Sequence, residues 1–92
     1  MSDEMKLLKQ RDLGARAKRL REDELLTQIF EGLKAQYMRE WAQTEFSDDK
    51  RREGQYLKLH ALLDVRAQLN AIIAEGSAAA AFLAHEEQFK AA

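Results

Sequence analysis

The chain has 92 residues, no proline or cysteine and only four glycines, and its 15 basic residues nearly balance its 16 acidic ones. A chain of this length forms one domain at most. The lack of cysteine excludes a disulfide scaffold, a thiolate metal site and a thiol nucleophile. The lack of proline and the few glycines argue against an all-β fold, because tight turns need these residues. We therefore predict a single all-α domain over residues 1–92.

The small net charge conceals a contrast along the chain. Residues 1–21 hold seven bases and three acids, residues 22–49 hold eight acids and two bases, and residues 50–92 are nearly balanced. The two charged blocks either pair with each other, within a chain or between copies, or the basic block binds nucleic acid. Pairing or plain solvation is favoured, because the acidic block would repel a nearby phosphate backbone.

The first predicted helix covers about residues 3–20. Ser2 can cap it, and the acids that follow suit the positive end of a helix dipole. Its two apolar stripes are out of phase on either side of Gly14. The helix is therefore expected to bend or loosen at this glycine.

The second predicted helix covers about residues 24–43, with Asp23 as its N-cap. One side of this helix is apolar. The apolar stripe consists of Leu26, Ile29, Phe30, Leu33, Tyr37 and Trp41. Such a stripe is typical of a helix that packs on one neighbour.

The third predicted helix covers about residues 49–75, with Ser47 or Asp48 as its cap. Two adjacent seams are expected on it. The first seam reads Tyr56, Leu59, Leu63, Arg66, Asn70 and Ile73, and the second reads Leu62, Val65, Leu69 and Ile72. A wide apolar face packs on more than one neighbour. We expect the second helix to cover one seam in a long antiparallel hairpin, and the first helix or another subunit to cover the other.

A short alanine-rich helix over about residues 77–90 is expected to end the chain. Gly76 is placed to end the third helix, and Ser77 can cap the fourth. The alternative is one continuous helix through Gly76, at a cost of about 1 kcal/mol relative to alanine. The sequence leaves this choice open.

Nothing in the sequence has the spacing of a catalytic, cofactor or metal site. His60 and His85 lack the partners that zinc and di-iron patterns require. The three serines, Ser2, Ser47 and Ser77, stand at predicted helix starts, and many carboxylates cluster at such starts, where the dipole favours acids. We therefore predict no enzyme activity, no cofactor and no metal.

Protein contacts are the better candidate for function. Arg66 and Asn70 interrupt an apolar seam, either because it is exposed there or because they specify register with a partner. Phe82 and Phe89 are either core residues or anchors that dock in a partner's groove. The candidate interaction residues are Leu62, Val65, Arg66, Leu69, Asn70, Ile72, Phe82 and Phe89.

The basic first segment is the one candidate for nucleic-acid binding. Its candidate residues are Lys9, Arg16, Lys18, Arg19 and Arg21. These bases spread around the predicted helix, and no aromatic residue lies among them for base stacking. No short glycine turn marks a helix-turn-helix.

A stretch over about residues 15–76 carries a family resemblance through residues of helical pattern. It comprises Arg16-Ala17-Lys18-Arg19-Leu20, Asp23-Glu24-Leu25-Leu26, Phe30, Trp41, Val65-Arg66, Leu69 and Ile72 through Gly76. It resembles small all-helical proteins of tailed bacteriophages from the head and packaging gene region, mostly of unassigned function. The resemblance implies a small virion or packaging accessory protein and transfers no catalytic or binding residue.

The leading expectation is a non-enzymatic helical assembly or adaptor protein that forms a homo-oligomer. The alternatives are a packaging or regulatory factor that binds nucleic acid and a small phage-borne inhibitor of a host defence protein. No secretory signal or apolar run of about 18 residues is present, which predicts a location in the cytoplasm or a virion and no membrane partner. Oligomer number and partner identity stay open.

Overall fold

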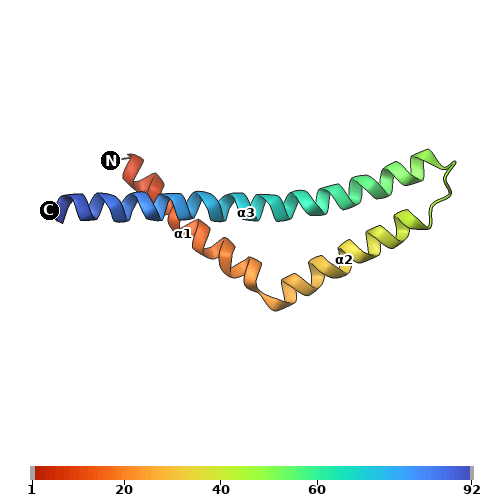
Figure 1. Cartoon of the computed structure of the whole chain (residues 1–92), viewed down its shortest axis with the longest axis horizontal. Helices are drawn as coiled ribbons and strands as arrows, with labels where there is room; N and C mark the ends of the chain where they lie inside the picture. The colour runs from red at the N-terminus through yellow and green to blue at the C-terminus, as the bar shows by residue number, and fades with distance from the viewer. Residues whose placement is uncertain (1, 92) are drawn as a thin grey trace. The chain divides into compact units, whose positions relative to one another are not determined.

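The computed structural model describes residues 2–91, which form three helices and no strand (Figure 1). The helices are α1 (Ser2–Glu22), α2 (Glu24–Ala42) and α3 (Asp49–Ala91). The all-α class is therefore confirmed. Four helices were expected, with one continuous helix through Gly76 as the alternative, and α3 runs through Gly76.

Two aspartates set the starts of α2 and α3. The Asp23 carboxylate accepts a hydrogen bond of 2.9 Å from the Leu26 amide, and the Thr27 hydroxyl donates to the Asp23 carbonyl at 2.9 Å. The Asp48 carboxylate accepts from the Arg51 amide at 3.2 Å. Both helix starts are thus confirmed, because a carboxylate satisfies an amide that has no partner within its helix. The predicted cap at Ser2 lies outside the described side chains.

Of the two possibilities left open at Gly76, the structure has the continuous helix and not the helix end. Among the described residues no glycine has a positive φ, so Gly76 keeps right-handed helical geometry and does not form a left-handed cap. It is also buried. The lack of a side chain serves close packing at this position, as described below for unit 1.

Contacts between the helices group the chain into two units. Unit 1 contains Met1–Arg21 and Gln68–Ala92, and unit 2 contains Glu22–Ala67. The helix α3 contributes to both. The expectation of one domain over the whole chain stays a prediction.

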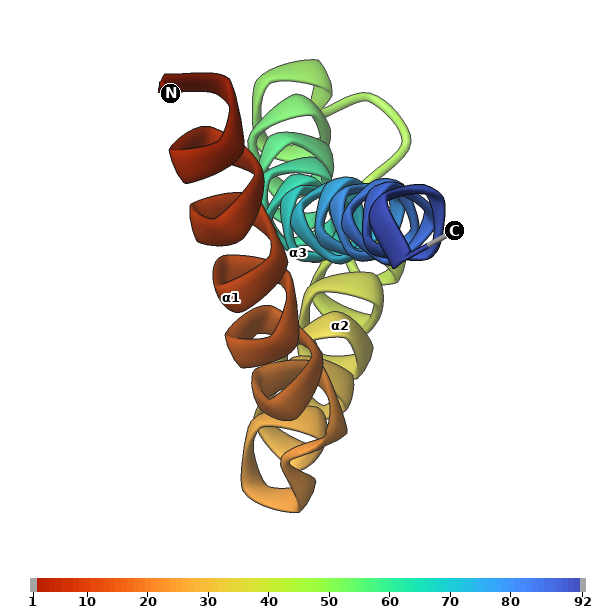
Figure 2. The ribbon, with the colours of Figure 1, turned by 90° about the vertical axis from the view of Figure 1, so that its left-hand side faces the viewer.

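Unit 1 is built on a close crossing of α1 and α3 (Figure 2). A Cβ atom placed on Gly14 would lie 2.6 Å from the Gly76 Cα, and one placed on Gly76 would lie 2.6 Å from the Gly14 Cα. Ala17 and Ala79, each three residues after one of these glycines, are also buried, at 5% and 2% exposed. The backbones approach closely because none of these positions carries a large side chain. The helix α1 passes through Gly14 without interruption.

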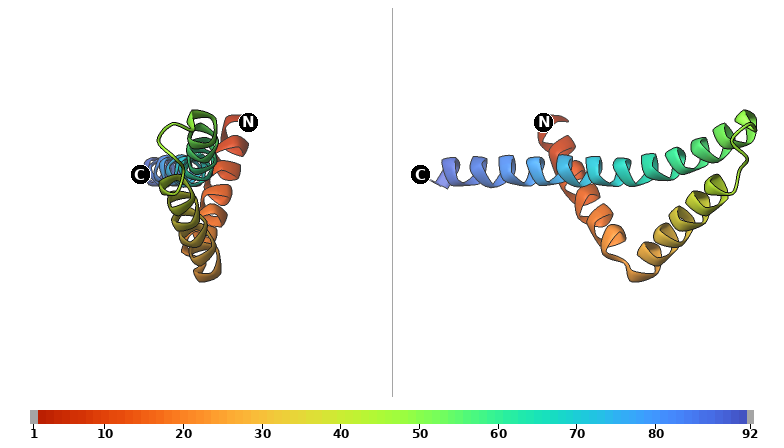
Figure 3. Two further views of the ribbon diagram at one scale, coloured as in Figure 1. Left: turned by 90° about the vertical axis from the view of Figure 1, so that its right-hand side faces the viewer. Right: turned by 45° about the vertical axis from the view of Figure 1, so that its right-hand side comes forward.

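In unit 2, α2 and the first half of α3 converge toward the loop that joins them (Figure 3), and hydrogen bonds from Arg52 to Thr44 and from Arg66 to Glu31 link the two segments. The residues of α2 that are half-buried include Leu26, Phe30, Leu33 and Tyr37, which confirms most of the predicted stripe. The half-buried residues of α3 in this unit are Arg52, Gln55, Leu59, Leu62 and Arg66. In both helices these positions alternate in steps of three and four, which places them on one face.

The predicted division of the third helix into two seams is wrong. The covered face takes Leu59 and Arg66 from the first predicted seam and Leu62 from the second, whereas Tyr56 and Val65 are exposed. It also includes Arg52, because a long side chain can pack its apolar stem while its charged end reaches water.

Within the described residues, α3 is the one helix that meets the length and composition required to cross a bilayer. Core helices of soluble proteins meet the same requirement. The expectation of no membrane partner stays a prediction.

Candidate protein-interaction surface

The described part of the chain has almost no apolar core. Its two buried apolar residues are Ala17 and Ala79, and no large side chain is fully buried. The exposed large apolar residues are Met5, Leu13, Leu20, Leu25, Ile29, Met38, Trp41, Phe46, Tyr56, Leu57, Leu63, Val65, Phe82 and Phe89. Single exposed apolar residues are normal, but contiguous ones mark interaction sites.

Some of these side chains surround a hollow in unit 2. The hollow has a volume of about 370 Å³ and is lined by Met38, Trp41, Ala42, Tyr56 and Leu59. All five are apolar or aromatic, and they come from the end of α2 and the start of α3. A concave apolar surface of this kind suits an apolar side chain of a partner.

Arg52 contacts Trp41, one of the residues that line this hollow. Its guanidinium lies 4.3 Å from the centre of the Trp41 ring and donates a 3.2 Å hydrogen bond to the Thr44 hydroxyl. Thr44 is buried, and its hydroxyl donates to the Trp41 carbonyl at 2.6 Å. The cation–π contact and these hydrogen bonds orient the indole.

The loop between α2 and α3 carries one strongly exposed aromatic residue. Phe46 is 91% exposed, and the Arg52 guanidinium lies 5.8 Å from its ring. The side chain therefore contributes little to the packing of unit 2 and remains open to a partner.

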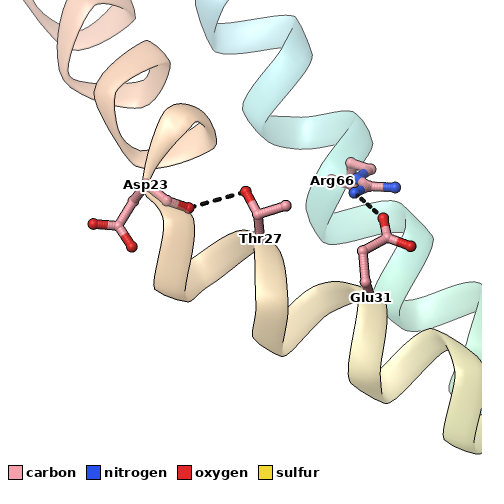
Figure 4. Close-up of polar contacts among 4 residues, drawn as sticks. All are labelled: Asp23, Thr27, Glu31 and Arg66. Atoms are coloured by element: carbon pink, nitrogen blue, oxygen red, sulfur yellow. Dashed lines mark hydrogen bonds and ion pairs between the residues drawn. The ribbon is translucent and has the colours of Figure 1, made fainter.

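Arg66, a predicted interaction residue, has its partner within unit 2. Its guanidinium donates a 2.8 Å hydrogen bond to the Glu31 carboxylate and lies 5.7 Å from the Phe30 ring (Figure 4). The hydrogen bond and the positive charge of Arg66 lower the pKa of Glu31 below its usual value. The interaction therefore fixes how α2 and α3 meet at this level.

Asn70, the other polar residue in the predicted seam, is exposed and bonded within unit 1. Its side-chain oxygen accepts a 3.0 Å hydrogen bond from the Arg21 guanidinium at the end of α1. Both polar interruptions thus make contacts that bridge two helices of the same chain.

The remaining predicted interaction residues divide by exposure. Leu62, Leu69 and Ile72 are half-buried, whereas Val65, Phe82 and Phe89 are exposed. The structure does not bring them together into one patch on a single unit, because Leu62 and Val65 belong to unit 2 and the others to unit 1. Sequence reasoning missed the hollow, although Met38 lies three residues before Trp41 on one flank of α2.

The basic residues of α1 lie on several sides of the helix. Lys18 and Arg21 border a hollow of about 360 Å³ in unit 1, together with Arg11, which was not among the predicted residues. Lys9 borders a second hollow of about 420 Å³ with Met5, Lys6, Gln10 and Leu13. Arg16 and Arg19 are exposed elsewhere on α1.

Residues 2–91 contain no group of three His, Asp or Glu side chains placed to hold a metal ion. No known protein family, curated protein or solved structure matches the chain.

Proposed function

We propose that this chain is a non-enzymatic helical assembly or adaptor protein that acts through protein contacts and forms a homo-oligomer. The observation that carries the proposal is a contrast among the described residues, which bury two alanines as apolar core and leave many large apolar side chains exposed. Burying apolar surface is the main favourable term in protein association, at about 25 cal/mol per Å². A second chain would therefore gain free energy by covering these faces.

We also propose that α2 and α3 form an antiparallel hairpin within each chain. Two contacts of unit 2 support this arrangement. Arg66 pairs with Glu31 in the middle of α2, and Arg52 contacts Trp41 and Thr44 at its end. The later residue of α3 thus meets the earlier residue of α2.

The biological setting that we propose is a bacteriophage virion or its packaging machinery, inside the host cytoplasm or the particle. This setting rests on the sequence resemblance over about residues 15–76. A small helical protein with open apolar faces is suited to such an assembly.

Size-exclusion chromatography with light scattering tests the proposal. The expected result is a mass that is a multiple of 10.6 kDa at micromolar concentration and that falls on dilution. A folded chain that stays at 10.6 kDa up to millimolar concentration would contradict it.

A nucleic-acid-binding factor is the second candidate, because Arg11, Lys18 and Arg21 converge on one hollow of unit 1. A mobility-shift titration with a short duplex DNA tests it. Replacing Lys18 and Arg11 by Gln should lower affinity and reduce the salt slope by about 0.9 per lost phosphate contact. Replacing Lys50 and Lys58 in unit 2 by Gln is the matched control, and equal effects of both variants would contradict this candidate.

A further inference from the structure

Two bases beside the hollow of unit 2 have no counter-charge among the described residues. Lys34 lies on the same flank of α2 as two residues that line the hollow, four residues before Met38 and seven before Trp41. The Arg52 guanidinium lies 4.3 Å from the centre of the Trp41 ring and is bonded to Thr44, toward the loop. Neither base forms an ion pair within the described part of the chain. The hollow therefore has a base toward each end of its α2 side.

The acids nearest to these bases do not offset them. Glu31 is already paired with Arg66 at 2.8 Å. Glu53 precedes Tyr56 by three residues, and this step places it farther round α3, away from Leu59 and the hollow. The surface beside the hollow is therefore positive, and electrostatic complementarity favours an acidic occupant.

The C-terminal half of α3 carries exposed aromatic residues and acids on one side. Their positions are separated by seven, four and three residues, which aligns them along one side of a helix. The acidic aromatic stripe consists of Glu75, Phe82, Glu86 and Phe89. Phe82 and Phe89 are 54% and 80% exposed, Glu75 is exposed and Glu86 is half-buried. Neither acid forms an ion pair with a described residue, so unit 1 leaves the stripe without a partner for its charges.

We propose that the acidic aromatic stripe of one copy docks on the hollow of unit 2 of a second copy, with Phe82 in the hollow. The proposal rests on the self-association proposed above and names the surfaces that form it. The hollow of about 370 Å³ offers the Phe82 ring the aromatic faces of Trp41 and Tyr56 and the thioether of Met38. Aromatic pairs and sulfur–aromatic contacts are favourable beyond the apolar area that they bury.

The two surfaces match in register when the docked helix runs in the same direction as α2. Glu75 precedes Phe82 by seven residues, and Lys34 precedes Trp41 by seven. Seven residues span about 10 Å along a helix axis. With Phe82 beside Trp41, Glu75 therefore meets Lys34.

The same register brings complementary groups together at the other end of the hollow. Glu86 follows Phe82 by one turn and so reaches the end of α2, where Arg52 contacts the Trp41 ring. Phe89 lies one turn farther, at the loop that carries Phe46. The Phe46 ring is 91% exposed and lies 5.8 Å from the same guanidinium. Both acids and both aromatic residues of the stripe thus meet a suitable partner.

The charge pattern selects this occupant over the exposed side of α1 in a second copy. Lys9 and Arg16 flank Leu13 on that side, and all three side chains are exposed. With Leu13 in the hollow, these bases would approach Lys34 and Arg52, and like charges at close range are unfavourable. The stripe of α3 brings acids to the same surface.

A charge swap tests the register. Lys34→Glu in one variant and Glu75→Lys in another should each weaken self-association at least about threefold at low salt, because an attraction becomes a repulsion. Sedimentation equilibrium measures the affinity. An equimolar mixture of the two variants should regain association, because each chain then offers the charge that the other one lacks.

Matched controls make the same charge changes outside the contact. Arg39→Glu changes an exposed base on a different side of α2 from Lys34, and Glu87→Lys changes an exposed acid on a different side of α3 from Glu75. Both controls should associate like the unchanged chain. A variant with unchanged affinity, a mixture that does not recover, or a control weakened as much as its variant would overturn the contact.

Replacing the apolar anchor tests the contact without a change of charge. Phe82→Ser should weaken self-association at least about tenfold, as truncation of a central anchor does. Val65→Ser is the control, because Val65 is also on α3 and also 54% exposed. Equal effects of the two would overturn the contact. An unchanged chain that is monomeric at low salt would remove the proposed function as well, whereas an associating chain that is indifferent to Phe82→Ser would overturn the contact alone.

Cross-linking gives a further measurement that does not depend on the charged variants folding. Ala78 precedes Phe82 by one turn, as Met38 precedes Trp41. Because the chain has no cysteine, Met38→Cys and Ala78→Cys chains can be mixed and oxidised, and a disulfide-linked heterodimer is expected. Ala84→Cys in place of Ala78→Cys is the control, because Ala84 is exposed on the side of α3 away from Phe82. Equal yields from both pairs would contradict the proposed register.

Discussion

The contact between Gly14 and Gly76 leaves no room for a side chain at either position. A Cβ at either residue would come within 2.6 Å of a backbone Cα atom on the other helix, which cannot move aside as a flexible side chain can. The other two glycines, Gly32 and Gly54, have no atom of another part of the chain within 4 Å of an added Cβ. The four glycines therefore have two different energetic roles.

These roles predict opposite effects of the same substitution. Gly14→Ala and Gly76→Ala should each destabilise the chain by about 1–3 kcal/mol, because the crossing helices are forced apart. Gly32→Ala and Gly54→Ala should stabilise it by up to about 1 kcal/mol, because alanine favours the helix and meets no obstacle. Chemical denaturation measures all four. Stabilisation by Gly14→Ala would show that the close crossing does not form.

The lowered pKa of Glu31 predicts a pH-dependent contribution to stability. Because Arg66 favours the charged carboxylate in the folded chain, this contribution is present above the pKa of the unfolded state and is lost as pH falls through the folded value. Glu31→Gln should therefore lower the melting temperature at pH 7, and the difference should shrink as pH falls below about 4. Thermal melts monitored by circular dichroism between pH 2 and 8 would measure it.

The control for this titration is Glu87→Gln, since Glu87 is exposed and forms no ion pair with any described residue. Its effect on melting temperature should be small at every pH. A Glu31→Gln difference that persists unchanged at pH 2 would mean that Glu31 acts through packing and not through its charge.

At the scale of the element, α3 has packed residues on one side and exposed residues on the other. In its C-terminal part Gly76 and Ala79 are buried and Leu83 is half-buried, whereas Phe82 and Phe89 are exposed. Phe82 and Phe89, which the sequence left as either core residues or anchors for a partner, thus lie outside the packed face. Helix packing in unit 1 depends on small residues that allow close approach.

The difference in burial between Leu83 and Phe89 predicts which C-terminal side chain stabilises the single chain. Leu83→Ala should cost about 1 kcal/mol, roughly half the value of a fully buried leucine. Phe89→Ala should change the stability by less than about 0.5 kcal/mol, as exposed substitutions usually do. Urea denaturation of both variants at a concentration where the chain is monomeric would measure this. A larger loss for Phe89→Ala would assign Phe89 to the core.

Local signals in the sequence predicted the elements well. The starts of α2 and α3 follow from Asp23 and Asp48, because a cap acts on amides only three residues away. The continuation of α3 through Gly76 could not be predicted from local signals, because it depends on packing against Gly14, which is distant in sequence. The covered face of α3 was also mispredicted, since Arg52 and Arg66 lie on it through contacts with Thr44 and Glu31 that no hydrophobic periodicity reveals.

At the scale of the whole molecule, the exposed apolar surface resembles protein interfaces in its amino-acid composition. The described residues bury two alanines as apolar core, whereas tryptophan, tyrosine and methionine border an exposed hollow. Aromatic residues and methionine are enriched at protein interfaces. The hollow was not predicted as a site, because its residues come from two helices whose relative register the sequence does not specify.

This arrangement predicts that stability depends on protein concentration. If copies bury one another's open faces, association stabilises the folded chain by mass action. For a dimer, each tenfold rise in concentration then adds about 0.7 kcal/mol per chain, which raises the melting temperature by about 3–5 °C for a domain of this size. Calorimetric scans from micromolar to millimolar chain concentration would measure this rise. A melting temperature that is constant across this range would mean that the single chain is stable with its apolar faces in water, and self-association would then have no part in its folding.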